Sequence, residues 1–148
     1  MTVAETKILI TGAAKRIGAA LEKALASDGW HVLIHCNKNI DDAQAVAADI
    51  RKNAGRADVL QADLADPNAC RRLMHEAAAF GDLRAVINNA SLFKYDTIDD
   101  FSSETLQAHM AVNVTAPALL ISEFAKYLEP RHLKHGEQGS VINILDAK

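Results

Sequence analysis

The segment KILITGAAKRIG, residues Lys7 to Gly18, decides the fold. A short β-branched run over 7–11 stops at Gly12, as a buried parallel strand does before a turn. A helix is predicted to start near Ile17, and a helix that follows a strand so closely points its free backbone N–H groups at an anion such as a pyrophosphate. Gly12 permits the tight turn, and Gly18 permits close packing of the helix on the strand. The middle glycine of the G-x-G-x-x-G pattern is absent, so a strand–helix turn that merely needs glycine stays an alternative.

The same alternation of strand and helix continues along the chain. Further strands are predicted at 31–35, 58–61, 85–88 and 140–145, and helices at 17–27, 41–53, 67–80 and 103–128. In the first helix the apolar residues at helical spacing are Ile17, Ala20, Leu21, Ala24 and Leu25. The last helix contains Asn113 and Pro117, both unfavourable in a helix interior, which predicts a kink. The pattern predicts one α/β domain over residues 1–148 with a doubly wound, mostly parallel, Rossmann-like sheet.

Composition and charge narrow the function classes. The chain has 148 residues, of which 49% are hydrophobic, and a net charge of −3. Without a basic excess we expect neither nucleic acid nor a membrane as a partner. The N-terminal apolar run is short and lacks a signal-peptide cleavage site, and Cys36 and Cys70 lie far apart, so a cytoplasmic protein with inert thiols is expected. His132 and His135 stand in a polar loop without a third ligand, and no metal site is predicted.

The residues after the second predicted strand bear on which dinucleotide would bind. The segment 35–39 (HCNKN) contains no acid, although a fold that prefers NAD usually places Asp or Glu there for the ribose 2′-hydroxyl. Lys38 and Arg16 offer cations for a 2′-phosphate instead. Asn37 and Asn39 offer amide donors. The alternative is that Lys38 and Lys15 are ordinary solvated charges, as each alone would be. Two basic positions that converge on one expected pocket without a competing acid predict NADP(H).

Ordered motifs along the chain resemble those of the short-chain dehydrogenase/reductase family. The turn 11–18 resembles the family's TGxxxGxG turn with Arg16 in place of the second glycine, as in the TGxxKRxG turn of pteridine reductases. The segment 88–91 (NNAS) is similar to the family's NNAG and matches the NNAS of pteridine reductases. The segment 113–117 (NVTAP) resembles NVxxP. The resemblance implies an NADP-dependent reductase of the short-chain type that acts on a pterin-like small substrate.

The resemblance also implies roles for individual residues. The cofactor-binding set is Gly12, Lys15, Arg16, Ile17, Gly18, Asn37, Lys38, Asn39, Asp63, Leu64, Asn89, Ala90 and Ser91. Within it, Asp63 would bond the adenine amino group, whereas taken alone it could be a cap-region acid of the helix that Pro67 opens. On the substrate side, Ser91 would contact the pterin or a cofactor phosphate. Phe93 would sandwich the pterin ring against the nicotinamide, although an isolated aromatic after a strand is more often core packing.

Two catalytic candidates follow from the same resemblance. Asn113 would hold a water of the family's proton relay, with a satisfied core amide as the alternative. Asp146 falls where the family usually has Ser and pteridine reductases have Asp, so it could bond a substrate amidine or relay a proton; without the resemblance it is a surface Asp. The family's acid is the Tyr of a YxxxK motif, and neither Tyr95 nor Tyr127 stands in one.

The family places YxxxK beyond the last predicted strand, past Lys148. We therefore expect a chain that is incomplete at its C-terminus, with further strands missing, and a complete protein that forms a homo-oligomer. Leu92 replaces a more usual Ser, which leaves another carbonyl substrate, such as a 3-oxoacyl thioester or a sugar, as an alternative. A non-catalytic NADP-binding or interaction module is the remaining alternative if the chain ends at Lys148.

Overall fold

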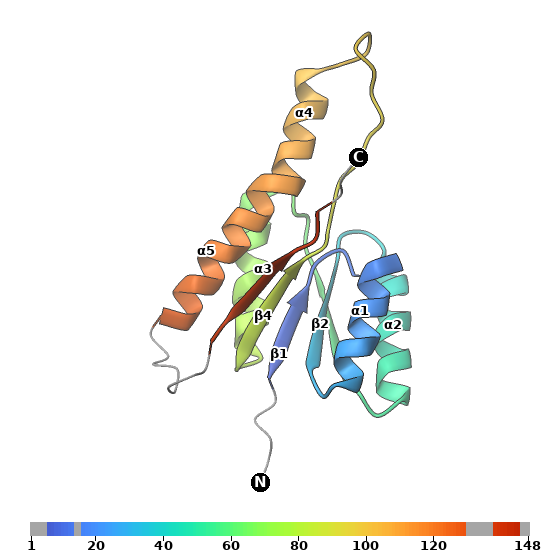
Figure 1. The fold of residues 1–148 in the computed structure, drawn as a ribbon, viewed down its shortest axis with the longest axis vertical. Helices are drawn as coiled ribbons and strands as arrows, with labels where there is room; N and C mark the ends of the chain where they lie inside the picture. The colour runs from blue at the N-terminus through green and yellow to red at the C-terminus, as the bar shows by residue number, and fades with distance from the viewer. Residues whose placement is uncertain (1–5, 14–15, 130–137, 146–148) are drawn as a thin grey trace.

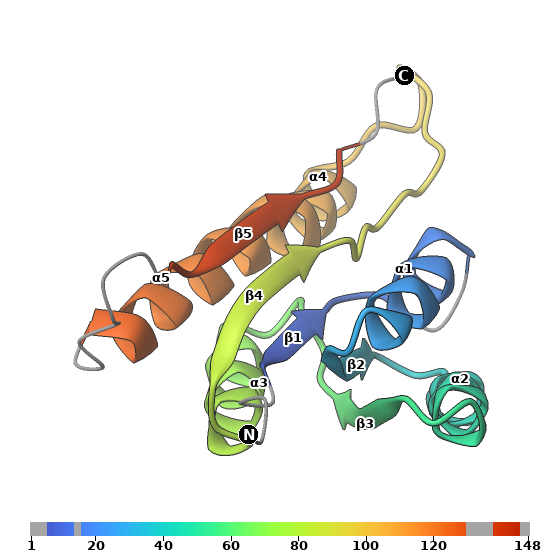
Figure 2. The same ribbon diagram turned by 60° about the horizontal axis from the view of Figure 1, so that its bottom comes forward.

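The computed structural model describes residues 6–13, 16–129 and 138–145, with only the backbone of Arg16. A five-stranded parallel sheet carries helices on both of its faces (Figure 1, Figure 2). The strands are β1 (Lys7–Ile10), β2 (His31–Cys36), β3 (Arg56–Gln61), β4 (Leu83–Asn88) and β5 (Ser140–Asn143). The helical elements are α1 (Arg16–Ser27), α2 (Ile40–Lys52), α3 (Pro67–Ala79), α4 (Ser103–Met110), the π-helical turn η1 (Ala111–Thr115) and α5 (Ala116–Leu128). The predicted alternation and the parallel sheet are confirmed.

The strand order places a change of direction at the centre of the sheet. The order is β3-β2-β1-β4-β5, so the chain moves outward from β1 to β3 and then returns to the other side of β1. Leu9 of β1 is in register with Leu33 of β2 and with Val86 of β4. In open α/β sheets, ligands bind outside the carboxyl ends of the strands at such a switch point, here between β1 and β4.

Alternate residues of the central strands face two separate helix layers. Leu9 shares a buried core with Leu73 of α3 and with α5. Its neighbour Ile10 shares the opposite core with Ala26 of α1 and Ile50 of α2. Because both faces of the central strands are covered, their sequences are continuous apolar runs rather than alternating ones.

Helix α1 buries a different stripe from the one that the apolar pattern predicts. Three predicted core residues are exposed, namely Ile17, Ala20 and Ala24. The side that faces the interior consists of Gly18, Glu22 and Ala26, while Leu21 and Leu25 are half-buried. A Cβ on Gly18 would lie 2.6 Å from the Cα of Ala13, so the glycine packs on the turn itself rather than on the strand. Because of this close approach, the side of α1 that contains Gly18 faces the interior, and Ile17 lies at the surface.

The long helix predicted over 103–128 is interrupted where its sequence is least helical. Residues 111–115 form a π-helical turn that contains Asn113, and Pro117 lies in the first turn of α5, where a missing N–H is tolerated. The predicted kink is therefore a π turn. In Figure 1, α4 continues past the carboxyl ends of the strands, so side chains of this segment can reach the chain that leaves β4.

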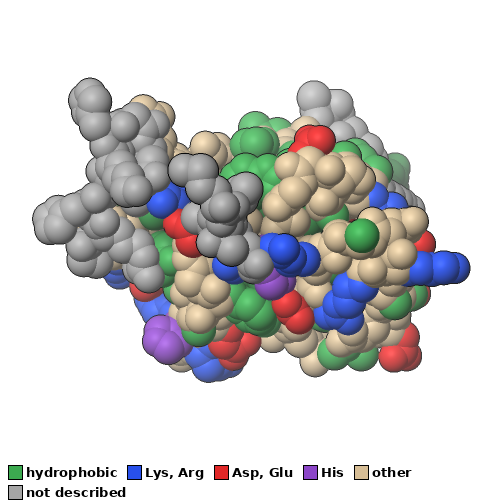
Figure 3. All heavy atoms as spheres, turned by 90° about the horizontal axis from the view of Figure 1, so that it is seen from below, with side chains coloured by type: hydrophobic (Ala, Val, Ile, Leu, Met, Phe, Trp, Pro, Cys, Tyr) green, Lys and Arg blue, Asp and Glu red, His purple; other side chains and the backbone are tan. Residues whose placement is uncertain are grey.

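The opposite end of the molecule, at the amino ends of the strands, carries mixed charge. Figure 3 shows acidic and basic side chains interspersed on this face. Ion pairs near these strand ends join Lys23 to Asp49 at 2.6 Å and Arg84 to Asp82 at 2.6 Å. Within the described ranges, no helix combines the length and apolar character needed to span a bilayer.

Candidate functional site

A cavity of about 680 Å³ lies at the carboxyl ends of the strands, and its size suits a small organic ligand. It is lined by the carboxyl end of β2 and by the segments that follow all five strands, together with residues of α1 and η1. The predicted cofactor-binding residues that line it are Gly12, Ile17, Gly18, Asn37, Lys38, Asn39, Asp63, Leu64, Asn89, Ala90 and Ser91. Lys15 and the side chain of Arg16, the other two predicted members, lie outside the described part of the chain. The prediction thus names residues that the fold gathers from four separate segments.

Gly12 allows the segment after β4 to reach the turn after β1. Its φ is +64°, a conformation that other residues rarely adopt. A Cβ at this position would lie 2.6 Å from the Cα of Ala90. The glycine is therefore required both by the backbone conformation and by the close approach of a neighbouring chain.

The hydroxyl of Thr11 joins these two segments. Thr11 Oγ1 accepts hydrogen bonds from the backbone N–H groups of Asn89 at 3.0 Å and of Ala90 at 3.1 Å. The side-chain Nδ2 of Asn89 donates to the carbonyl oxygens of Thr11 and Gly12, each at 3.1 Å. The amide nitrogen of Asn89 is thus committed to the protein, and the NNAS segment is fixed on the glycine turn.

His35, to which the sequence analysis gave no role, connects three of the strand ends. Its backbone oxygen accepts from the N–H of Ala13 at 3.1 Å, and its Nδ1 accepts from the N–H of Gly12 at 3.1 Å. Its Nε2 lies 3.0 Å from the carbonyl oxygen of Ala62, which can only accept, so Nε2 carries the hydrogen. Burial lowers the pKa of His35, against the opposing effects of the Ala62 bond and the Asp63 charge. A polar residue at the end of an apolar strand, opposite a glycine turn, was the available signal.

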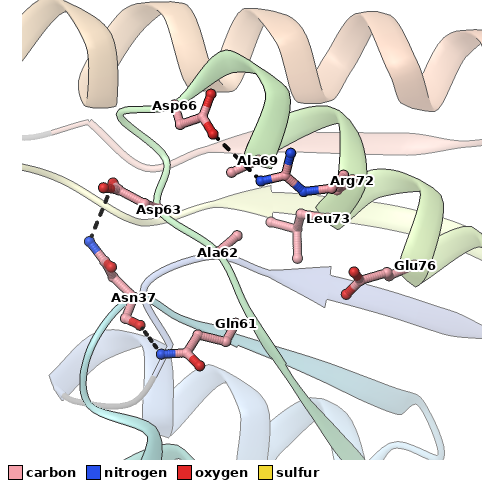
Figure 4. A pocket seen from close by; sticks show the side chains of 9 residues that line it. All are labelled: Asn37, Gln61, Ala62, Asp63, Asp66, Ala69, Arg72, Leu73 and Glu76. Carbon is pink, nitrogen blue, oxygen red and sulfur yellow. Dashed lines mark hydrogen bonds and ion pairs between the residues drawn. The ribbon is translucent and has the colours of Figure 1, made fainter.

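Asn37 and Asp63 line both this cavity and a smaller pocket of about 350 Å³ (Figure 4). Asn37 Nδ2 donates to Asp63 Oδ1 at 3.5 Å, and Gln61 Nε2 donates to the carbonyl oxygen of Asn37 at 2.7 Å. Figure 4 marks both bonds with dashed lines. Asp63 Oδ1 also accepts from the N–H of Ala65 at 3.0 Å. Within the described residues both bonds to this carboxylate use Oδ1, so Oδ2 is the oxygen available to a ligand.

The helix after β3 is capped by Asp66 rather than by Asp63. Asp66 is the N-cap residue of α3, and its Oδ1 accepts from the N–H of Asn68 at 2.9 Å. The alternative of Asp63 as the capping acid is therefore wrong.

Of the substrate-side and catalytic candidates that the structure describes, one lines the cavity and two do not. Ser91 lines the cavity, whereas Asn113 and Phe93 do not. Asn113 Oδ1 accepts from the N–H of Leu92 at 2.7 Å, and its Nδ2 donates to the carbonyl oxygen of Leu92 at 2.9 Å. Phe93 is 61% exposed, so the alternative of a core aromatic is wrong. Asn113 is also exposed, and its amide is hydrogen-bonded to Leu92 without being a core amide. Asp146 lies outside the described residues.

A buried carboxyl lies near the wall of the cavity. Glu22 is fully buried, and neither of its side-chain oxygens has a hydrogen-bond partner among the described residues. Burial raises its pKa from 4.5 to about 9. Burial, and then the Glu22 carboxyl, raise the pKa of the Cys36 thiol, which lines the cavity. Both Cys36 and Cys70 are buried free thiols.

No cluster of three or more His, Cys, Asp or Glu side chains suited to a metal occurs among the described residues. His132 and His135 lie outside them.

Known proteins resemble this chain in fold and in sequence. The family described as short chain dehydrogenase matches residues 6–146. An uncharacterized oxidoreductase of Methylorubrum extorquens is 34% identical over 146 residues, which cover 97% of this chain and 56% of the relative. FolM alternative dihydrofolate reductase 1 from Brucella canis, solved with NADP, has a TM-score of 0.83 at 38% identity over 97% of this chain and 56% of that one. A 3-oxoacyl (acyl-carrier-protein) reductase from Agrobacterium tumefaciens, also with NADP, has a TM-score of 0.83 at 26% identity over 93% and 51% of the two chains. The chain spans about half the length of these relatives.

Proposed function

The chain belongs to the short-chain dehydrogenase family, and on that premise we propose that its protein is a reductase that uses NADPH to reduce a pterin-like substrate. The observation that carries the proposal is that one cavity at the switch point is lined by every member of the predicted cofactor set whose side-chain surroundings the structure describes. The residues present suit a dinucleotide, because Gly12 lets the segment after β4 close on the turn after β1, and the bonds of His35 and Thr11 hold the backbone around the cavity in place.

The choice of NADP over NAD is supported by the residues between β2 and α2. Asn37, Lys38 and Asn39 all line the cavity, and no acid stands among them. Asn39 is the N-cap residue of α2, yet its side chain makes no capping bond to the helix. Lys38 and the amide of Asn39 would therefore meet a 2′-phosphate at a helix N-terminus, where the dipole also favours an anion.

Bound NADPH would supply the hydride, and the protein would orient the cofactor and substrate. His35 and Thr11 would keep the phosphate-side turn in one conformation, as their bonds to Gly12, Asn89 and Ala90 imply. Asn113 would hold the backbone of Leu92 at the substrate side through its two bonds.

A flat heteroaromatic substrate is supported by the segment after β4. Ser91 lines the cavity, and Phe93 presents an exposed ring two residues later. The solved relative named as an alternative dihydrofolate reductase is 38% identical to this chain. Asp146 is proposed as the substrate-side carboxyl. A 3-oxoacyl thioester is the second candidate, favoured by the NADP-bound relative of that name and by Leu92 at the cavity wall.

The experiment compares substrates in the whole protein, with NADPH consumption as the signal. We expect kcat/KM for a dihydropterin to exceed that for a 3-oxoacyl thioester by at least about ten-fold. Phe93→Ala should lower the dihydropterin value, whereas Phe101→Ala, which removes a comparably exposed ring, should not. Turnover of the thioester alone would favour the second candidate, and NADPH binding without turnover of either would favour a non-catalytic module.

A further inference from the structure

The chain segment 92–94 follows β4 without regular secondary structure, yet both of its ends are held by side chains. At one end, Asn113 makes two hydrogen bonds with the backbone of Leu92. At the other end, His109 Nε2 accepts from the N–H of Lys94 at 2.9 Å. His109 and Asn113 are four residues apart, so they lie on the same side of the continuous helical segment α4–η1. Phe93 stands between the two held residues.

The second ring nitrogen of His109 fixes the tautomer that this arrangement needs. His109 Nδ1 lies 2.8 Å from the carbonyl oxygen of Thr105, one turn earlier in α4. A carbonyl oxygen can only accept, so Nδ1 carries the hydrogen and Nε2 is left with a lone pair for the Lys94 N–H. Both nitrogens of a half-buried ring are therefore used, one to anchor the ring to its own helix and one to hold the loop.

The ring of His109 also contacts the exposed aromatic. The centroids of Phe93 and His109 lie 6.5 Å apart with an interplanar angle of 67°, an edge-to-face arrangement. Phe93 nevertheless remains 61% exposed. An exposed ring on an irregular segment would ordinarily lose conformational freedom when a ligand stacks on it, and that loss weakens binding. Holding the backbone on both sides of Phe93 removes much of this loss before the ligand arrives.

We propose that His109 is a positioning residue that fixes Phe93 as a stacking surface and so favours flat aromatic substrates over flexible aliphatic ones. This inference rests on the proposed function for the identity of the substrate. The role of His109 in ordering the segment rests on the two hydrogen bonds and the ring contact alone. We place His109 behind Phe93 and out of contact with the reacting atoms, so it acts on substrate affinity rather than on hydride transfer.

The test uses two substitutions that separate the acceptor from the ring. His109→Phe keeps an aromatic edge against Phe93 but removes the acceptor, and His109→Gln supplies an acceptor oxygen without the ring. In the whole protein, His109→Phe should raise KM for a dihydropterin about three- to ten-fold, the factor that one net hydrogen bond corresponds to. Its kcat, its NADPH affinity and its KM for an aliphatic ketone should stay unchanged. His109→Gln should recover most of the lost affinity, and His75→Phe, at an exposed histidine of α3, is the matched control.

A second readout does not depend on any substrate. Amide hydrogen exchange at Phe93 and Lys94 should be faster in His109→Phe than in the wild type or in His75→Phe. Unchanged exchange would overturn the positioning role. Equal losses in NADPH affinity, dihydropterin affinity and unfolding midpoint would overturn it as well, because they would show a general structural defect. If the wild type reduces no dihydropterin while exchange responds as expected, the proposed substrate fails and the positioning role stands.

Discussion

Replacing the buried carboxyl of Glu22 with an amide should make the protein markedly more stable at neutral and alkaline pH. Glu22 is fully buried on the interior side of α1, and within the part of the chain that the structure describes neither of its oxygens has a hydrogen-bond partner. Its pKa is raised from 4.5 to about 9, with burial as the cause. Glu22→Gln keeps the size and the polarity of the side chain but cannot ionise.

The magnitude follows from the difference in proton uptake between the two states. Between pH 4.5 and about 9 the folded carboxyl holds a proton that the unfolded one releases, so the folded state loses stability as the pH rises through this window. Keeping a carboxyl protonated costs about 1.4 kcal/mol for each pH unit above its ordinary pKa. Because pH 7 is 2.5 units above the ordinary pKa of 4.5 and still below the raised pKa of about 9, the cost at pH 7 is about 3 kcal/mol. Glu22→Gln should therefore match the wild type near pH 4.5 and exceed it by about 3 kcal/mol at pH 7.

The assay is urea unfolding of the whole protein at several pH values, followed by circular dichroism. The matched control is Glu76→Gln, at an exposed position of α3, which should show no pH-dependent gain. A difference in unfolding free energy between Glu22→Gln and the wild type that stays constant from acid to neutral pH would show that Glu22 does not change protonation on folding, and the pKa-based origin of the effect would be wrong.

Three further substitutions test the turn and the proposed substrate side. Gly12→Ala should destabilise the protein by about 2 kcal/mol or more and abolish NADPH binding, because of the positive φ and the clash with Ala90; a near-normal urea midpoint would contradict this. His35→Leu should cost about 2–3 kcal/mol by leaving the Gly12 N–H and the Ala62 carbonyl without partners, as urea unfolding would measure. Because burial lowers the pKa of His35, the wild type should also lose stability as the pH falls below 6.5. If His35→Leu loses the same stability over that acidic range, His35 is not the cause of the loss. Asp146→Ser should lower kcat/KM for a dihydropterin by about ten-fold or more and leave a thioester substrate unaffected; equal effects on both would remove Asp146 from the substrate side.

The fold and the cavity were predictable because both depend on local sequence signals. Gly12 and the strand before it mark the first strand end, and the carboxyl ends of parallel strands meet at one edge, so later strand ends add residues to the same site. The interruption of the last long helix at Asn113 was predictable because Asn and the Pro that follows it are poor helix formers. His35 and Glu22 were missed because their environments depend on long-range packing. His35 is explained by its bonds to the turns after β1 and β3, and Glu22 by the close approach of α1 at Gly18.

The decisive measurement for an NADP-specific reductase site is the pair of equilibrium affinities of the whole protein for NADPH and NADH. We expect NADPH to bind about 10- to 100-fold more tightly, the effect of a charge-assisted contact with the 2′-phosphate. Lys38→Gln should remove most of that preference, whereas Lys52→Gln, at the far end of α2, should not. Equal affinity for the two cofactors, or tighter binding of NADH, would show that the site does not recognise the 2′-phosphate.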